Sequence, residues 1–423
     1  MWGYDAARSG ATPMRIPKRL HLQWLRRLGT PRPAWPLQLD DIGKLDFDLS
    51  YTPVVMDDLV FVGSMVSDRV TAYRIDDGAE VWRFYTDGPV RLAPAAWDGR
   101  IYLVSDDGHL HCLNAQTGEQ LWRFRAGPTD HLVLGNCRVV SMWAARGGPV
   151  VKDGTVYFAA GVWPFMGTFA YALDAASGAI VWQNTGESTN WQRQPHGGAY
   201  SFAGISPQGY LAATEDRLVV SGGRSTPALL DRHTGELLYL DVYGRGVGGY
   251  RVEADGEHFY NHGARHRLED GQRDGDGLLV NEVLLERAER VADRVDGPIF
   301  TVLAARGRVL LTTADGTLYC FGPEVSQDPL VHDERAGFVG RAAVFPPPDG
   351  ERGAAIVRRA AAIGGGYALF LGVGDGELME TVARRTELHL VGVDPDREKL
   401  EALRRHFDDA GLYGTRIALL PGR

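Results

Sequence analysis

The sequence predicts a mainly β protein followed by a shorter α/β segment, and three observations carry this prediction. A short phrase of sequence recurs four times between residues 72 and 239. Glycine accounts for 53 of the 423 residues, well above its usual share of about 7%. Beyond residue 325 the phrase stops, and strand-like and helix-like stretches alternate. The first two observations indicate many strands joined by tight turns, and the third indicates a separate unit.

The recurring phrase is a β-rich strand, an Asp or Asn, a turn that closes on Gly, and an aromatic residue four positions after that Gly. The turn glycines lie 40, 60 and 57 residues apart, so a unit of about 40 residues repeats with insertions. This period is typical of a β-propeller blade. The glycines and their aromatic partners are Gly78 with Trp82, Gly118 with Trp122, Gly178 with Trp182, and Gly235 with Tyr239.

A β-rich run precedes each of these turns, at residues 59–63, 100–104, 155–159 and 217–221. Turn residues come directly before the runs, so each unit is expected to contain antiparallel hairpins. A single blade cannot bury both of its faces. We therefore predict that the three Trp side chains and Tyr239 fill the gaps between neighbouring blades.

From about residue 1 to 325 the chain resembles the propeller repeats of the pyrroloquinoline-quinone (PQQ) type, found in quinoprotein dehydrogenases and in an outer-membrane assembly lipoprotein. The opening Trp2-Gly3-Tyr4 with Arg8-Ser9-Gly10, followed by residues 20–24, is similar to the start of such propellers, where an early strand closes the ring. The resemblance therefore implies a PQQ-like propeller over residues 1–335.

Two weaker copies, at residues 256–260 and 307–320, bring the recognisable blades to about six. The last copy lacks the Gly-x-x-x-Trp ending, so the ring is expected to be complete or short by part of a blade.

The resemblance implies a quinone cofactor only together with an adjacent-cysteine disulfide and a calcium ion held by acidic and amide side chains. Cys112, Cys137 and Cys320 are far apart, so PQQ is not expected. Three such cysteines offer no zinc-ligand spacing either, and no metal is indicated. Nor does the sequence show a Ser/His/Asp or two-carboxylate group that would be catalytic.

The charge and hydropathy of the chain exclude two classes of partner. The net charge is −9 and the sequence pI about 5.8, so no nucleic acid is expected. The longest uncharged stretch, residues 360–374, is too short and Gly-rich to span a bilayer. No secretory signal opens the chain, although propellers of this type are usually extracytoplasmic. Because the sequence begins almost directly on the first repeat motif, we expect an extracytoplasmic protein whose leader is missing.

A ligand site on the propeller is expected where its longest insertions converge, at residues 127–148 and 187–204. Arg, His and aromatic side chains on such loops can form a polar binding surface for a protein or small-molecule ligand. The candidate contacts are His131, Trp163, Arg193, His196 and Arg224.

The α/β segment begins after a linker, residues 336–353, that contains three consecutive prolines. A helix is expected at 354–362, a strand at 367–371 and a second helix at 377–385. A strand at 388–393, a helix around 400–407 and a strand at 415–420 complete a βαβαβ order. This order is the opening half of a doubly wound sheet, so residues 354–423 are predicted to form a partial Rossmann-like domain.

The loop after the first of these strands has the pattern Gly-x-Gly-x-Gly at Gly372, Gly374 and Gly376. A dinucleotide fingerprint would need a third glycine at position 377, which is Glu. The loop resembles the first motif of class I S-adenosylmethionine (SAM) methyltransferases, although Phe370 stands where that family usually has an acidic residue. The resemblance implies that SAM contacts Gly372, Gly374, Asp375 and Gly376, and that Asp394 accepts hydrogen bonds from its ribose hydroxyls.

Three functions remain open from the sequence. The first is a non-catalytic binding or scaffolding propeller that carries a partial SAM-binding fold. The second is a SAM-dependent methyltransferase whose propeller delivers substrate. Methyltransferase sheets have about seven strands by resemblance, and this chain ends after the third, so the second function makes the chain an inactive fragment. The third is a PQQ-dependent dehydrogenase.

Overall fold

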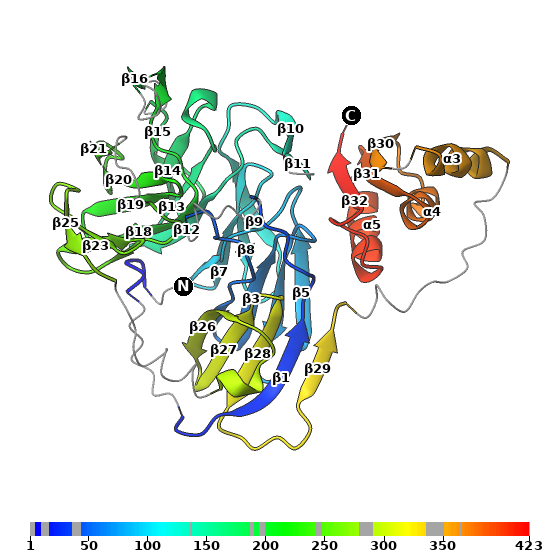
Figure 1. Ribbon diagram of the computed structural model, residues 1–423, viewed down its shortest axis with the longest axis horizontal. Helices are drawn as coiled ribbons and strands as arrows, with labels where there is room; N and C mark the ends of the chain where they lie inside the picture. Colours follow the sequence, from blue (N-terminus) through cyan, green and yellow to red (C-terminus); the bar gives the residue numbers. More distant parts are fainter. Residues whose placement is uncertain are drawn as a thin grey trace.

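The computed structural model describes residues 5–9, 17–35, 44–135, 138–186, 190–193, 199–241, 248–278, 291–335, 351–363 and 365–422. These residues form a large antiparallel β region and a smaller α/β unit that lies beside it (Figure 1). None of the helices among them is long and apolar enough to cross a membrane.

Within the described residues, the β region contains six sheets of four antiparallel strands. The strands of the first three are β2 (Val54–Met56), β3 (Leu59–Ser64), β4 (Arg69–Arg74), β5 (Glu80–Tyr85), β6 (Ala95–Trp97), β7 (Arg100–Val104), β8 (His109–Asn114), β9 (Gln120–Arg125), β12 (Gly147–Lys152), β13 (Thr155–Ala160), β14 (Phe169–Asp174) and β15 (Ile180–Asn184). The strands of the fourth and fifth are β18 (Gly209–Ala213), β19 (Arg217–Gly222), β20 (Ser225–Asp231), β21 (Leu237–Tyr239), β22 (Glu253–Ala254), β23 (His258–Asn261), β24 (Ala264–Arg267) and β25 (Arg273–Asp276).

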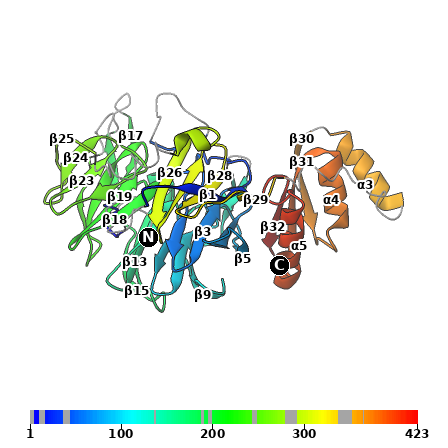
Figure 2. The same cartoon turned by 90° about the horizontal axis from the view of Figure 1, so that it is seen from below.

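The sixth sheet combines both ends of the β region. It consists of β26 (Ile299–Ala305), β27 (Arg308–Thr313), β28 (Thr317–Gly322) and the early strand β1 (His21–Arg27), which pairs antiparallel with β28. A further strand, β29 (Leu330–Asp333), pairs parallel with the outer side of β1, and Figure 2 shows these strands side by side. The sequence prediction that an early strand closes the ring is confirmed.

The first strand of each sheet lies innermost. Strand β2 contacts β6, β6 contacts β12, and β18 contacts β22. Strands β12 and β18 pair directly, Gly147 with Gly209, which joins the third and fourth sheets into one of eight strands. The first five sheets therefore meet through their inner strands, which is the arrangement of β-propeller blades.

The aromatic residue that ends each repeat packs on the turn glycine of the next sheet. Trp82 covers Gly118, and its indole nitrogen donates a hydrogen bond to the carbonyl oxygen of Ala115 (3.0 Å). Gly118 has φ +73°, and a Cβ there would lie 2.6 Å from the Trp82 ring, so only glycine fits. Trp122, Trp182 and Tyr239 cover Gly178, Gly235 and Gly271 in the same way. The predicted role of these side chains is confirmed.

The sixth sheet obtains its aromatic residue from the N-terminal strand. Trp24 pairs with Cys320 at the position where Trp82 pairs with Ala72 in the first sheet. Its indole is fully buried, covers Gly78, and donates to the carbonyl oxygen of Ile75 (2.8 Å). The sixth copy itself has no Gly-x-x-x-Trp ending, and Trp24, from the start of the chain, supplies the indole in its place.

The N-terminal residues 5–8 lie along the inner strands. The amide nitrogens of Ala213 and Ala254 donate to the carbonyl oxygens of Ala6 and Ala7, both at 2.8 Å. The Arg8 guanidinium donates to the carbonyl oxygens of Leu211 and Pro149. Its carbon lies 5.1 Å from the centre of the Tyr210 ring, and burial lowers the pKa of Arg8 to about 10. This segment therefore fills space between the third, fourth and fifth sheets. Trp2-Gly3-Tyr4 and Gly10 of the predicted opening motif lie outside the described residues.

The α/β unit contains three parallel strands in the order β30 (Gly365–Leu371), β31 (Glu387–Asp394) and β32 (Ile417–Pro421). Helices α3 (Glu351–Ala361), α4 (Glu377–Arg385) and α5 (Arg397–Asp409) complete it. Leu390, Leu400 and Phe407 are buried in its own apolar core. The predicted βαβαβ order is confirmed, although α3 begins at Glu351, inside the predicted linker; residues 336–350 of that linker lie outside the described residues.

Helix α5 holds the α/β unit against the first sheet of the propeller, as both cartoon views show. The Asp408 carboxylate pairs with Arg69 and accepts a hydrogen bond from the Tyr85 hydroxyl (2.7 Å). Arg404 pairs with Asp87 in the segment that leaves β5. These pairs are partly or fully buried, so they fix the orientation of α5 on the propeller.

Candidate functional site

The propeller has one face on which its long insertions gather, here called the insertion face. Segments 86–94 and 161–168, and the described residues of 126–146 and 185–208, lead into inner strands or join middle strands on this face. Two insertions carry hairpins, β10 (Leu132–Gly135) with β11 (Arg138–Ser141), and β16 (Asn190–Arg193) with β17 (Tyr200–Ala203). A third contains the short 3-10 helix η2 (Pro164–Met166), which contacts β17.

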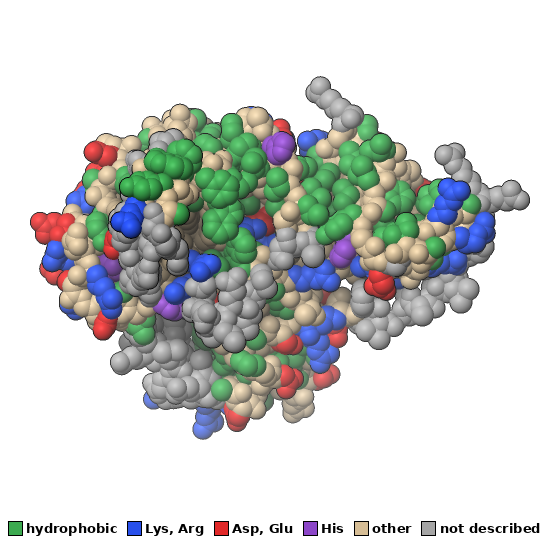
Figure 3. Space-filling view, turned by 45° about the horizontal axis from the view of Figure 1, so that its top comes forward, with side chains coloured by type: hydrophobic (Ala, Val, Ile, Leu, Met, Phe, Trp, Pro, Cys, Tyr) green, Lys and Arg blue, Asp and Glu red, His purple; other side chains and the backbone are tan. Residues whose placement is uncertain are grey.

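Five large apolar side chains are exposed together on η2, its preceding residue and the β16–β17 hairpin. Between 43% and 62% of each is accessible to solvent. Trp191 lies edge-on to Phe202 (5.0 Å between ring centres) and stacks on Tyr200 (6.5 Å). Hydrophobic side chains gather on this side of the molecule in Figure 3. The residues of this aromatic patch are Trp163, Phe165, Trp191, Tyr200 and Phe202.

Trp35 connects the aromatic patch to the buried interior. Its ring lies edge-on to Trp163 (6.0 Å between ring centres), and its indole nitrogen donates to the side-chain oxygen of Gln208 (2.8 Å). The guanidinium carbon of Arg146 lies 5.5 Å from the centre of the Trp35 ring. The Trp163 side of the aromatic patch therefore packs on Trp35, which Gln208 and Arg146 hold in place.

Beneath Trp35 lies a buried ion cluster of two carboxylates and two guanidinium groups: Asp48, Arg91, Asp106 and Arg146. Arg91 contacts Asp48 (2.5 Å) and Asp106 (2.6 Å), and Arg146 contacts both oxygens of Asp106 (2.9 Å). Burial alone would raise the pKa of Asp106, but the two guanidinium groups outweigh it and lower the pKa to about 2. Burial raises the pKa of Asp48, against the opposing effect of Arg91. The cluster ties together segments that lead into four strands.

The predicted contacts of the insertion face have different positions. Trp163 belongs to the aromatic patch, and Arg193 is exposed at the end of β16 within the same hairpin as Trp191. His131 is exposed just before β10, and Arg224 is exposed in the turn between β19 and β20. His196 lies outside the described residues. The structure thus brings Trp163 together with the hairpin of Arg193.

The sequence analysis did not identify Phe165, Phe202, Trp35 or the ion cluster as site residues. The Trp-Pro-Phe tripeptide at 163–165 and the alternation of Tyr200 and Phe202 could have signalled an exposed aromatic surface. The ion cluster has no comparable signal, because its four members come from segments distant in sequence and meet only in the closed ring.

The cysteines do not fit the quinone set that the resemblance would imply. Cys112 lies on β8 and Cys320 on β28, in different sheets, and both are buried free thiols. Burial raises the pKa of each thiol to about 12. Cys137 lies outside the described residues.

The Gly-x-Gly-x-Gly loop lies at the carboxyl end of β30, between that strand and α4. Gly372, Gly374 and Gly376 have φ values of +79°, +59° and +88°. No atom would lie within 4 Å of a Cβ on Gly372 or Gly374, so the space beside the backbone of these two glycines is open. Glu377 is the first residue of α4, so an acidic side chain opens that helix.

Asp394, at the carboxyl end of β31, contacts the same loop. Its Oδ2 accepts a hydrogen bond from the amide of Val373 (3.1 Å) and forms an ion pair with the ammonium group of Lys399 (2.8 Å). Its Oδ1 accepts a hydrogen bond from the amide of Asp396 (3.0 Å). The hydrogen bonds from Lys399 and from these two amides lower the pKa of Asp394 to about 2. The carboxylate is ionised and lies beside the loop, and both of its oxygens already accept from donors within the chain.

Comparison with known proteins supports the repeat in the first part of the chain. Residues 32–161 match the family model PQQ_2, described as "Outer membrane protein assembly factor BamB". A tetrathionate hydrolase of Acidithiobacillus ferrooxidans is 27% identical over 116 residues, which is 27% of this chain and 20% of that protein. The quinohemoprotein alcohol dehydrogenase ADH IIB of Pseudomonas putida is 26% identical over 181 residues, 39% of this chain and 23% of that protein. The matched segments thus span about a fifth of each relative.

Solved structures with similarity include BamB of Moraxella catarrhalis, with a TM-score of 0.39, 19% identity, and coverage of 65% of this chain and 70% of that chain. The quinohemoprotein alcohol dehydrogenase ADHIIG of Pseudomonas putida has a TM-score of 0.42 and 16% identity, with coverage of 64% and 47%. The family match supports a PQQ-type repeat in residues 32–161, and the six sheets extend the same strand pattern beyond it.

Proposed function

We propose that this chain is a non-catalytic binding propeller that holds a partner protein on its insertion face. The observation that carries this proposal is the aromatic patch, five large side chains that are exposed side by side on two different insertions. Contiguous exposed apolar surface of this kind marks interaction sites in soluble proteins. Aromatic residues are also enriched in the cores of protein interfaces.

The chemistry beside the patch supports binding rather than turnover. Both carboxylates of the ion cluster are held by guanidinium groups, and Asp106 has a pKa of about 2, so it is a poor acid or base near neutral pH. Arg193 gives the patch a positively charged border. The expected partner surface is therefore apolar with an acidic border.

The family description adds a consistent indication, because it names an assembly factor of outer-membrane proteins. Such a factor works through other proteins. By the same resemblance we propose an extracytoplasmic location for this chain. No quinone chemistry is proposed, because the cysteines do not form the implied pair.

Site-specific photo-crosslinking in the producing cells tests the proposal. A benzophenone amino acid at position 202 should give one discrete protein adduct, which Trp191→Ser reduces about tenfold. The same group at Val181, an exposed apolar residue on the outer strand β15, is the control and should give no such adduct. Identical adducts from both positions, or none from position 202, would contradict the proposal. An adduct of the chain with itself would identify a second copy as the occupant instead.

The α/β unit favours a second candidate function, the binding of a SAM-type ligand. Its supporting observation is the juxtaposition of open glycine backbone at Gly372 and Gly374 with the ionised Asp394, at the carboxyl ends of parallel strands. The loop amides would hold the amino-acid end of such a ligand, with Asp375 beside them, and Asp394 would accept from the ribose hydroxyls. The ligand, when bound, would supply an activated methyl group.

Calorimetry with S-adenosylhomocysteine tests this second candidate. Micromolar binding by the chain, weakened at least tenfold in Asp394→Ala and unchanged in Glu398→Ala, is the expected result. Glu398 is an exposed acidic residue near the start of α5, four residues after Asp394, and serves as the control. An absence of heat with the unmodified chain would show that the loop is only a strand-to-helix turn.

A further inference from the structure

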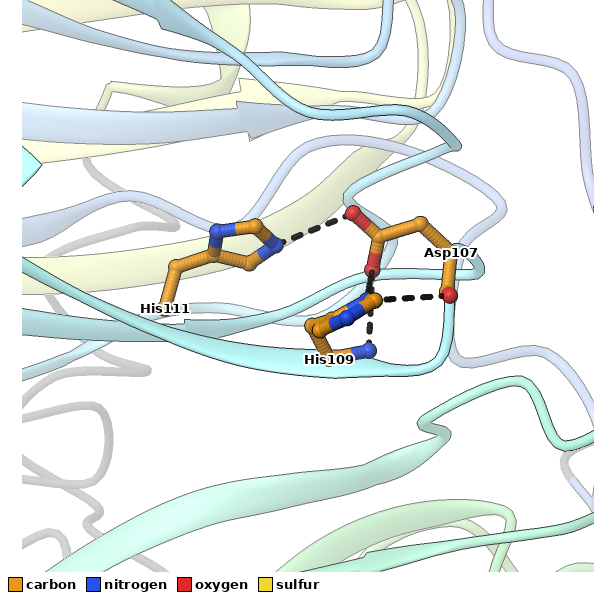
Figure 4. A group of neighbouring side chains, drawn as sticks. All are labelled: Asp107, His109 and His111. Carbon is orange, nitrogen blue, oxygen red and sulfur yellow. Dashed lines mark hydrogen bonds and ion pairs between the residues drawn. The ribbon is translucent and has the colours of Figure 1, made fainter. Parts of the chain in front are cut away.

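A small group of potential metal ligands lies at the start of strand β8, where the chain turns from β7 (Figure 4). The sequence Asp107-Gly108-His109-Leu110-His111 alternates, so both histidines project from the same face of the strand. Nε2 of His111 lies 3.0 Å from Oδ2 of Asp107, and Nδ1 of His109 lies 3.4 Å from Oδ1. One ligand atom from each residue lies within 4.8 Å of the other two.

The propeller repeat itself does not require these imidazoles. The sixth sheet has the same turn, with Asp315 in place of Asp107, and its Oδ1 accepts from the amide of Thr317 (3.1 Å) as Asp107 does from His109 (2.9 Å). Pairing of the following strands puts Cys112 and Cys320 at equivalent positions. On this register the residues equivalent to His109 and His111 are Arg69 and Thr71 in the first sheet, Phe169 and Tyr171 in the third, and Thr317 and Tyr319 in the sixth.

We propose that Asp107, His109 and His111 form a binding site for a first-row divalent metal ion of the Zn²⁺ type. Two imidazoles and one carboxylate are a common ligand set for such ions. Hard cations such as Ca²⁺ prefer all-oxygen sites, so they fit this set less well. The proposal concerns the second blade alone and is independent of the partner-binding surface and of the SAM-type loop.

The geometry is close to that of a bound site. Two ligands at about 2.1 Å from one tetrahedral ion lie about 3.4 Å apart. This matches the separation of His109 Nδ1 and Asp107 Oδ1 (3.4 Å) and is slightly more than that of His111 Nε2 and Asp107 Oδ2 (3.0 Å). Any pair of ligand atoms that lies farther apart, up to the 4.8 Å limit of the group, must close to about 3.4 Å when such an ion binds. His109 is half-buried while the other two are buried, so its ring can make this adjustment and leave the open coordination positions toward solvent.

Neighbouring groups already orient His111. Its Nδ1 lies 3.2 Å from the side-chain oxygen of Gln120, and its ring lies edge-on to Phe84 (5.8 Å between ring centres). A ligand histidine typically has such a partner on its second nitrogen, which directs the first toward the metal. Gln120 is therefore a positioning residue in the proposed site.

Calorimetric titration of the full chain with ZnCl₂, after removal of metal by a chelator, tests the proposal. One Zn²⁺ per chain should bind with micromolar or tighter affinity. The double variant His109→Thr/His111→Tyr, which copies the sixth sheet, should keep the fold and lose more than about 100-fold in affinity. Gln120→Leu should weaken binding about 10- to 100-fold. Co²⁺ added to the unmodified chain should give a visible absorption band that the double variant lacks.

The matched control is His258→Asn, because His258 also lies beside two carboxylates, Asp255 and Asp274, in the fifth sheet. This variant should bind Zn²⁺ like the unmodified chain. Equal Zn²⁺ binding by the double variant and the unmodified chain would overturn the proposal, as would an absence of binding in both. In the latter case Asp107 and His111 would form only a structural ion pair.

Discussion

The indole nitrogen of Trp24, near the start of the chain, donates a hydrogen bond to the carbonyl oxygen of Ile75 in the first blade. The ring of Trp24 simultaneously covers Gly78, while its strand completes the sixth blade beside β28. One residue thus links the last sheet to the first. The ring is closed by the same indole-on-glycine contact that joins its other sheets.

Replacing a turn glycine is predicted to destabilise the propeller for two reasons that can be measured separately: the positive φ of the backbone, and the lack of space for a Cβ beside the neighbouring indole. Gly118→Ala introduces a residue at φ +73° and a Cβ 2.6 Å from the Trp82 ring. Gly99→Ala introduces the same backbone strain at φ +70°, but no atom lies within 4 Å of its Cβ. We expect about 1–2 kcal/mol of destabilisation for Gly99→Ala and about 1–3 kcal/mol more for Gly118→Ala. Denaturant unfolding of both variants measures the difference, and equal losses would contradict the contact.

Glu253, on the inner strand β22, predicts a dependence of stability on pH. Burial raises its pKa to about 6, against the weaker opposing effects of Arg251 and Arg8. Because the pKa in the folded state lies above the unfolded value of about 4.5, its contribution to stability is complete below pH 4.5 and is lost as the pH rises through 6. Glu253→Gln should therefore raise the free energy of unfolding by about 2 kcal/mol at pH 8 and leave it nearly unchanged at pH 4.5. A variant that is no more stable at pH 8 would contradict this assignment.

The attachment of helix α5 is predicted to depend on Asp408. Asp408→Asn removes the charge that faces Arg69 and should weaken docking of the α/β unit by about 1–3 kcal/mol. Hydrogen exchange should become faster in α5 and at the edge of β5. Asp409→Asn removes only an exposed partner of Arg83, so it should change exchange little. Equal effects of the two substitutions would show that the buried pair does not hold the unit.

Lys399 is predicted to compete with a SAM-type ligand for Asp394. Its ammonium group lies 2.8 Å from the Oδ2 that would accept from a ribose hydroxyl. Lys399→Met leaves that oxygen with the amide of Val373 as its donor, and it should tighten binding of S-adenosylhomocysteine several-fold in calorimetry. Weaker binding by this variant would show that Lys399 supports the ligand or the loop rather than occluding it.

The sequence analysis predicted the order of strands, turns and helices more completely than the contacts between residues far apart in the chain. The spacing of Gly118 and Trp122 was visible because one repeat follows another, and a period of about 40 residues indicates blades. The role of Trp24 was not predicted, since its partners Ile75 and Gly78 are distant in the chain and only ring closure brings them together. In the α/β unit each element was predicted to within a few residues, because strand and helix patterns there are local.

In the candidate sites, too, features that depend on local sequence were predictable, and contacts between distant residues were not. The position of Asp394 beside the glycine loop follows from strand order, which the sequence predicted. Its pairing with Lys399 depends on side-chain geometry within the first turn of α5, and spacing alone does not reveal it. The ligands at Asp107, His109 and His111 could have been found from their alternation, whereas the ion cluster around Asp106 could not.

The central claim is that the chain uses tryptophan in two ways: buried indoles such as Trp24 hold the ring together, and exposed ones such as Trp191 face a partner. Denaturant unfolding of Trp24→Ala and Trp191→Ala under identical conditions tests it most directly. Trp24 is fully buried, and Trp191 is 61% exposed. We predict a loss of about 3–5 kcal/mol for Trp24→Ala and a change within about 0.5 kcal/mol for Trp191→Ala. Similar losses for the two variants would contradict the division, and with it both the ring closure and the proposed docking surface.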